Sequence, residues 1–195
     1  MMRYLWPTPV GIFDLKSRFQ NFETSTKNMI DDMPIRTKES NLLKVWDIQA
    51  YKELQTLVKE CVIEYTKNCK LGEELVFFDA FVNEYKFGEI NSPHSHACAK
   101  AFAIYFIQGL GKNHGDLLLH DPRGGVDWDD VIEETSRGNS GRRTTQHIPT
   151  VSGTLIIAPA YVIHSVEPNM LEQSRITLGI NLYSKDFLKN FNPDI

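Results

Sequence analysis

Three histidines and one arginine stand out in this sequence as groups that could do chemistry together. His94 and His96 are one residue apart, and side chains with that spacing on an extended segment point to the same side. His164 stands at the head of a later apolar segment, and Arg175 follows it eleven residues on. Neutral imidazoles are the commonest metal ligands, and two or three of them on rigid strands leave coordination positions open. The pattern predicts a mononuclear metal site formed by His94, His96 and His164, with Fe(II) as the metal.

The segment from Arg175 to Tyr183 predicts a strand whose two faces differ. The apolar face carries Ile176, Leu178, Ile180 and Leu182, and the polar face carries Arg175, Thr177, Gly179, Asn181 and Tyr183. An exposed sheet could present such a polar face to water. With His164 on the preceding strand, the polar face is better explained as the lining of a cavity. Arg175 would then present a planar guanidinium to a carboxylate.

The elements that must position these side chains are short strands that follow N-terminal helices. Residues 49–70 place apolar side chains on one stripe and charged ones opposite, which predicts an amphipathic helix that backs a sheet. From residue 75 onward, aromatic and β-branched runs predict strands within 75–87, 101–107, 115–121, 153–158 and 175–183. We therefore predict a mainly β (α+β) fold, a double-stranded β-helix or jelly roll supported by N-terminal helices.

The chain length of 195 residues fits one domain. We expect residues 1–72 to form an N-terminal extended segment and supporting helices, with prolines suited to a sheet edge, a weak helical pattern at 22–33 and a short helix capped by Ser40. Residues 73–185 are expected to form the jelly-roll core. Residues 121–150 contain four glycines and few apolar anchors, which predicts a long loop in that core.

The overall composition argues against several other classes of protein. Hydrophobic residues make up 42% and charged residues 24% of the chain, which argues against wholesale disorder. The net charge of -4 gives no electrostatic sign of nucleic-acid binding, and no apolar run approaches the roughly 18 residues of a membrane span. Three cysteines without CxxC spacing suit reduced thiols, so we expect a cytoplasmic protein. A homodimer is expected only as the commonest oligomeric state.

Several short motifs, taken in order, carry a resemblance to a known family. They are Asn83-x4-Gly88-x2-Asn91-x2-His94-x-His96, Asp121-Pro-Arg123, Gly153-Thr-Leu-Ile-Ile-Ala-Pro159, and His164-x-Val166-x-Pro168-Asn169 followed by Arg175-Ile-Thr177. Together they span roughly residues 75 to 183. The pattern resembles the iron(II)- and 2-oxoglutarate-dependent oxygenases, and within them a branch of prolyl-hydroxylase type.

This resemblance implies a role for each matched residue. His94, position 96 and His164 would be the metal ligands, and Arg175 with help from Thr177 would bind the far carboxylate of 2-oxoglutarate. Tyr105 would donate a hydrogen bond to the same carboxylate, although a tyrosine on an apolar strand also suits the core. The implied activity is a hydroxylation that couples decarboxylation of 2-oxoglutarate to succinate with oxidation of a small-molecule or peptide substrate that the sequence does not name.

One departure from the family pattern concerns the second ligand. His96 stands where these oxygenases carry Asp or Glu, so the site would have three neutral ligands instead of two histidines and one carboxylate. Asp116 on a neighbouring strand is a candidate for the missing carboxylate, and Cys98 is a weaker candidate ligand. The other histidines, His114, His120 and His147, are expected at the surface or in hydrogen bonds.

Two alternatives to the oxygenase prediction remain open at this stage. A three-histidine cupin, acting as a thiol dioxygenase or isomerase without 2-oxoglutarate, also fits the histidine spacing. It favours a glycine where this chain has Tyr161, and it gives no role to Arg175. A jelly-roll binding module without catalysis is the second alternative. Within the long loop, Trp128 could close over a substrate or anchor the loop, and the pair Arg142-Arg143 could meet an anion or water.

Overall fold

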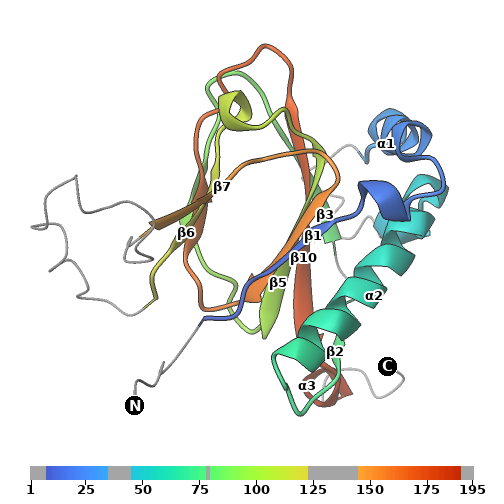
Figure 1. Cartoon of the computed structure of the whole chain (residues 1–195), viewed down its shortest axis with the longest axis vertical. Coiled ribbons are helices and arrows are strands. Elements are labelled where there is room, and N and C mark those ends of the chain that lie inside the picture. The colour runs from blue at the N-terminus through green and yellow to red at the C-terminus, as the bar shows by residue number, and fades with distance from the viewer. Residues whose placement is uncertain (1–7, 35–44, 78–79, 123–144, 190–195) are drawn as a thin grey trace, which may run out of the picture.

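The computed structural model of the chain describes residues 8–34, 45–77, 80–122 and 145–189. Two antiparallel sheets face each other, and helices lie against the outer side of the larger sheet (Figure 1). The larger sheet has the strand order β1-β8-β5-β10-β2, with β3 also paired to β10, and the smaller sheet has the order β4-β9-β6-β7. This is the double-stranded β-helix, or jelly roll, that the sequence predicts.

The secondary structure of the described residues is as follows. The strands are β1 (Gly11–Asp14), β2 (Leu75–Val76), β3 (Ala80–Tyr85), β4 (Asn91–His94), β5 (Ala101–Gln108), β6 (Leu117–His120), β7 (Thr145–Ile148), β8 (Thr154–Pro159), β9 (His164–Val166) and β10 (Arg175–Ser184). The α-helices are α1 (Phe22–Asp31), α2 (Lys52–Asn68) and α3 (Lys185–Lys189). Short 3-10 turns lie at Lys16–Arg18, Val45–Asp47, Gln49–Tyr51 and Lys112–His114.

Strand β5 is buried along almost its whole length because both of its faces are covered. Phe102, Ile104 and Phe106 point between the two sheets, where they pack with Leu117, Leu119 and Val166 of the smaller sheet. Ala103, Tyr105 and Ile107 point to the helical side. Each large apolar side chain buried in this way contributes roughly 1.5–3 kcal/mol. The continuous apolar run in the sequence is therefore explained by two hydrophobic layers that share one strand.

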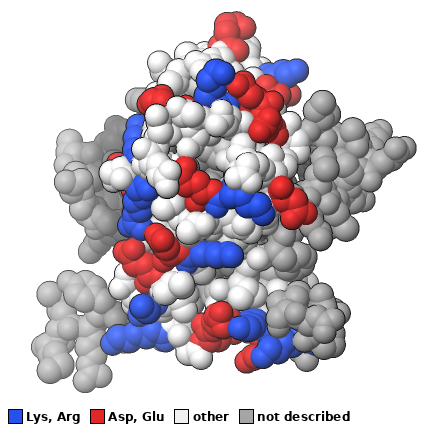
Figure 2. Space-filling view, turned by 90° about the vertical axis from the view of Figure 1, so that its right-hand side faces the viewer, with Lys and Arg blue, Asp and Glu red and all other residues white. Residues whose placement is uncertain are grey.

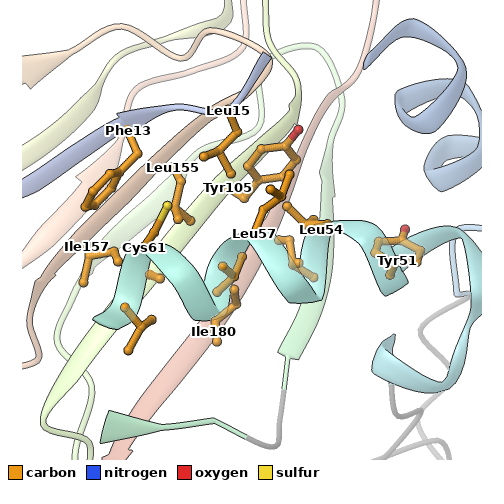
Figure 3. Packing of buried hydrophobic residues seen from close by; sticks show 14 of the residues in the cluster. Phe13, Leu15, Tyr51, Leu54, Leu57, Cys61, Tyr105, Leu155, Ile157 and Ile180 are labelled. Carbon is orange, nitrogen blue, oxygen red and sulfur yellow. The ribbon is translucent and has the colours of Figure 1, made fainter. Parts of the chain in front are cut away.

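Helix α2 covers the outer face of the larger sheet with one apolar stripe. Its buried residues are Leu54, Leu57, Val58, Cys61, Val62 and Tyr65. They pack against the helix-facing side chains of β1, β5, β8 and β10 (Figure 3). The helix predicted over residues 49–70 is confirmed, with its first turn in the 3-10 form. This layer covers the outer face of the larger sheet, and the opposite face carries the apolar side chains of β5 together with the polar ones of β10.

Two element predictions need correction. The strand predicted over 75–87 is divided into β2 and β3. The long loop predicted over 121–150 contains β7, which pairs with β6 at the edge of the smaller sheet. Only Ile148 of β7 is apolar and faces the core, so the segment has too little alternation to be recognised as a strand. The predicted helix start at Ser40, as well as Trp128 and the Arg142-Arg143 pair, lie outside the described residues.

Charged side chains of both signs are interleaved on the face shown in Figure 2. Ion pairs join Arg18 to Glu64 at 3.6 Å and Lys185 to Glu74 at 3.0 Å. Such exposed pairs contribute about 0–1 kcal/mol each, so the hydrophobic layers dominate the stability of the fold. Among the described helices, none is both long and apolar enough to cross a membrane.

Candidate metal centre and arginine site

The three histidines singled out by the sequence come together between the two sheets. His94 of β4 is paired directly with His164 of β9, and His96 follows β4, where its backbone N–H donates to the carbonyl of Ala160 at 3.1 Å. The two Nε2 atoms of His96 and His164 are 3.3 Å apart. One ring nitrogen from each histidine lies within 4.8 Å of the others. That spacing places three imidazole nitrogens around a common centre.

Each imidazole is fixed by a hydrogen bond from its Nδ1 atom. His94 donates to the backbone carbonyl of Ser92 at 2.7 Å, and His164 donates to that of Val162 at 3.1 Å. His96 donates to the side-chain carbonyl of Asn181 at 2.5 Å. A carbonyl oxygen can only accept, so each ring carries its proton on Nδ1 and leaves the lone pair on Nε2. Protein ligands to metal ions are held in this way, with the second ring nitrogen bound to an oxygen.

Burial keeps His164 in the neutral form that a metal ligand requires. The side chain is 1% exposed, and burial lowers its pKa to about 3, with the neighbouring His94 and His96 adding to the shift and the Val162 carbonyl opposing it. The ring of Phe102 stacks on His164 at 4.0 Å between centroids and on His96 at 5.1 Å. This aromatic wall limits the access of water to one side of the three imidazoles.

Arg175 lies on the polar face of β10, on the same side of the strand as Asn181. Its side chain is fully buried. Its Nη1 donates to the backbone carbonyl of His114 and, at 2.9 Å, to that of Glu167. Its Cζ lies 4.5 Å from the centre of the Tyr85 ring. Nε and Nη2 are buried and have no hydrogen-bond partner among the described residues. Burial lowers the pKa of Arg175, but a guanidinium stays protonated in a protein.

The unpaired Nε and Nη2 atoms form one edge of the guanidinium plane. Two parallel N–H groups on such an edge match the two oxygens of a carboxylate. Leaving a buried charge and two buried donors without partners costs several kcal/mol, so the edge is suited to an anionic ligand. Thr177, the next residue on this face of β10, is 5% exposed and offers a hydroxyl group.

Tyr105 does not lie where the sequence-based prediction places it. Alternate residues of β5 point to opposite sides, and Tyr105 shares its side with Ala103 and Ile107, against the helical layer. Figure 3 shows its ring beside Leu54 and Leu57 of α2. The proposed hydrogen bond from Tyr105 to a carboxylate of 2-oxoglutarate is therefore wrong, because the sheet lies between this hydroxyl and the histidines.

Asp116 does not supply the missing carboxylate ligand. It belongs to a second group of potential ligands with His147 and Glu167, in which the His147 Nδ1 atom lies 3.5 Å from Asp116 Oδ2. Their neighbours Leu117 and Val166 point into the core, so this group faces the outer side of the smaller sheet. Cys98 is exposed and belongs to neither group.

The structure also places beside the site two residues to which the sequence analysis assigned no role in it. Asn181 accepts the hydrogen bond from His96, and its position on the polar face of the last strand was a signal that could have identified it. His114 is fully buried beside Arg175 and hydrogen-bonded at both ring nitrogens. His120 and His147 lie on the outer side of the smaller sheet, where they contact Ser165 and Asp116.

The fold and the site define a jelly-roll protein with three histidines whose ring nitrogens converge and a buried arginine with two unpaired donors. The model of the family described as "Putative 2OG-Fe(II) oxygenase" matches residues 79–181, which is more than half of the chain. The chain therefore belongs to this family. It is an enzyme of the iron(II)- and 2-oxoglutarate-dependent oxygenase class, with iron(II) and 2-oxoglutarate as its cofactors.

Solved structures with little sequence identity share the fold. A prolyl-4-hydroxylase from Pseudomonas putida matches with a TM-score of 0.55 and 12% identity, over 91% of this chain and 89% of that one. HygX from Streptomyces hygroscopicus, solved with nickel and 2-oxoglutarate bound, matches with a TM-score of 0.59 and 9% identity, over 91% and 83%. A 2OG-Fe(II) oxygenase family oxidoreductase from Burkholderia pseudomallei matches with a TM-score of 0.51 and 13% identity. That match covers 69% of this chain and 57% of the Burkholderia protein. A comparison with curated proteins finds no match.

Proposed function

We propose that this protein is a hydroxylase that holds iron(II) with His94, His96 and His164 and binds 2-oxoglutarate through Arg175. The observation that carries the proposal is that three imidazoles with one nitrogen each within 4.8 Å of the others lie between the same two sheets as a guanidinium with an unpaired two-donor edge. When bound, iron(II) together with 2-oxoglutarate and O2 supplies the oxidant, and the reaction yields succinate and CO2 while a C–H bond of the substrate is hydroxylated.

The residues of the chain bind, orient and shield. The carbonyls of Ser92, Val162 and Asn181 fix the three rings, so their nitrogens need no reorientation when the metal binds. Arg175 receives the far carboxylate of 2-oxoglutarate on its Nε and Nη2 edge, and Thr177 adds a hydroxyl donor. Phe102 covers the histidines, which keeps water from part of the reacting centre.

A site with three neutral ligands leaves the charge of a divalent ion uncompensated by the protein. In the usual triad of two histidines and one carboxylate, the protein offsets one unit of that charge. Here the carboxylate next to the keto group of 2-oxoglutarate would offset one unit of the metal charge, while the far carboxylate pairs with the charge of Arg175. The absence of a carboxylate is thus compatible with the proposed chemistry, and it makes the anionic cosubstrate more important for charge balance.

The proposals for the substrate class and the location rest on the net charge and the cysteines. The substrate is a small molecule or a peptide, because the net charge of -4 does not attract a nucleic acid. The described cysteines Cys61, Cys69 and Cys98 are free, and an exposed thiol such as that of Cys98 suits a reducing compartment, so we propose a cytoplasmic location.

Succinate release tests the function directly. Protein loaded with iron(II) without oxygen and mixed with 2-oxoglutarate should release succinate after O2 is admitted, and Arg175→Ala should release far less. Tight iron binding without dependence on 2-oxoglutarate would support a three-histidine cupin instead. Lack of metal binding would support a non-catalytic binding module.

The metal ligands are tested separately from turnover. His164→Ala should weaken iron(II) binding, measured by anaerobic titration, because it removes one of three ligand nitrogens. An unchanged affinity would remove His164 from the site and with it the proposed ligand set.

A further inference from the structure

The guanidinium of Arg175 is held in one orientation by the backbone around it. The carbonyls of His114 and Glu167 both accept from Nη1, and the centre of the Tyr85 ring lies 4.5 Å from Cζ. A guanidinium rotates easily about its last side-chain bonds, so without these contacts several edges could face the interior. The two carbonyls occupy Nη1 and leave the Nε and Nη2 edge for a ligand.

The position of the His114 carbonyl depends on the His114 ring. Nδ1 of the ring accepts the backbone N–H of Leu110 at 3.0 Å, and Nε2 donates to the carbonyl of Gln173 at 3.1 Å. The ring therefore ties the turn before β6 to the loop that leads into β10. These two hydrogen bonds require the neutral ring with its proton on Nε2. Burial lowers the pKa of His114, which favours that form.

The same network reaches the ring beneath the guanidinium. The Gln173 carbonyl also accepts from Nδ2 of the buried Asn169, at 2.9 Å, and Nδ2 donates to the backbone carbonyl of Tyr85 at 3.0 Å. His114 is thus linked both to the carbonyl that holds Nη1 and to the strand that carries the stacked Tyr85 ring. The binding proposed above does not account for the full burial of this histidine and the pairing of both its nitrogens.

We infer that His114 is a positioning residue for cosubstrate binding: it fixes the turn whose carbonyl holds Arg175 Nη1, and so directs the Nε and Nη2 edge toward the far carboxylate of 2-oxoglutarate. The inference rests on the proposed function, because it assigns that carboxylate to Arg175. It predicts that His114 acts on 2-oxoglutarate affinity through Arg175 and has little effect on the metal.

Binding without oxygen tests this inference independently of turnover. The protein is loaded with Mn²⁺, and the dissociation constants of 2-oxoglutarate and pyruvate are measured by calorimetry. Pyruvate shares the 2-oxo acid group but lacks the far carboxylate. His114→Leu should weaken 2-oxoglutarate binding about tenfold or more, the change that corresponds to ~1.4 kcal/mol. Binding of Mn²⁺ and of pyruvate should change less than about twofold on the same scale.

A double mutant distinguishes a positioning role from a general structural one. In an Arg175→Met background, His114→Leu should add no further loss of 2-oxoglutarate affinity, because the group it orients is gone. His114→Asn, which can still accept from Leu110 N–H, should keep part of the affinity and provides a test if the leucine variant folds poorly. His120→Leu, on the outer side of the smaller sheet, is the matched control and should bind 2-oxoglutarate normally.

The possible results separate the inference from the proposed function. Unchanged 2-oxoglutarate affinity in both His114 variants would overturn the inference while leaving the function in place. Equal losses for 2-oxoglutarate, pyruvate and Mn²⁺, or an additional loss in the Arg175→Met background, would show a general structural role and would also overturn it. If the wild-type protein binds Mn²⁺ but not 2-oxoglutarate, the proposed function itself fails.

Discussion

Replacing Tyr105 by phenylalanine tests the side of the sheet on which this residue acts. Its hydroxyl is buried among apolar side chains, has no hydrogen-bond partner among the described residues and has its pKa raised by burial. An unpaired buried hydroxyl destabilises the folded state by about 1–3 kcal/mol. Its removal eliminates this cost, but the small void left by the oxygen offsets part of the gain in stability. We therefore expect Tyr105→Phe to increase the free energy of unfolding by about 1 kcal/mol.

The matched control is the buried Tyr51, whose hydroxyl donates to the Met29 carbonyl at 2.8 Å. Tyr51→Phe removes this bond and leaves the carbonyl unpaired, so it should lower the free energy of unfolding by about 1–2 kcal/mol. Urea unfolding of the two variants and the wild type measures both effects, and calorimetry on metal-loaded protein measures 2-oxoglutarate affinity. Tyr105→Phe should leave that affinity unchanged.

Two results would refute this reasoning. A loss of stability above about 1 kcal/mol in Tyr105→Phe would mean that the hydroxyl has a partner in solution. A tenfold weaker binding of 2-oxoglutarate would return Tyr105 to the cosubstrate site and would contradict the assignment of the two faces of β5.

Three further predictions follow from the site and its surroundings. Asn181→Leu removes the acceptor that fixes His96, so metal affinity in a titration should fall about 10–100-fold, whereas Asn181→Asp should retain binding. The pKa of His164 lies below its unfolded value of about 6.5, so the unfolded metal-free chain binds the extra proton between pH 6.5 and 3. As the pH falls from 7 to 5, this proton uptake should therefore lower the free energy of unfolding by about 2 kcal/mol. The decrease of the free energy of unfolding with pH should be smaller in His164→Leu. Gly115 has a φ of +78°, and a Cβ there would lie 2.4 Å from the Glu167 carbonyl oxygen. Gly115→Ala should therefore lower the free energy of unfolding in urea by at least ~1–2 kcal/mol. An unchanged urea midpoint would contradict this close approach.

The sequence predicts most of the fold because its signals are local. The stripe on α2 and the continuous run of β5 follow directly from helical and strand periodicity. The alternation in β10 predicted that Arg175 and Thr177 lie on the face opposite Ile176 and Leu178, and the structure shows this arrangement. Strand β7 was not predicted, because an edge strand with one apolar residue toward the core has almost no alternation of apolar and polar residues.

For the candidate site, residue types and spacing predicted which histidines come together, and the tertiary structure decided what holds them. The alternation in β10 places Asn181 on the polar face, but it does not indicate that the partner would be His96, 85 positions away, since that contact exists only after β4 and β10 come together. The face assigned to Tyr105 depends on which side of the larger sheet α2 covers. A strand buried on both sides has no polar face to reveal this.

Sequence alone thus determined the jelly-roll class and the set of chemical groups, because alternation along a strand and the identity of a side chain are properties of the chain itself. Only the folded structure decided which groups come close together, which tautomer each imidazole adopts and which edge of Arg175 is left without a partner. These depend on backbone carbonyls brought from distant segments, whose direction is fixed by strand pairing and turn geometry and not by the residues that carry them.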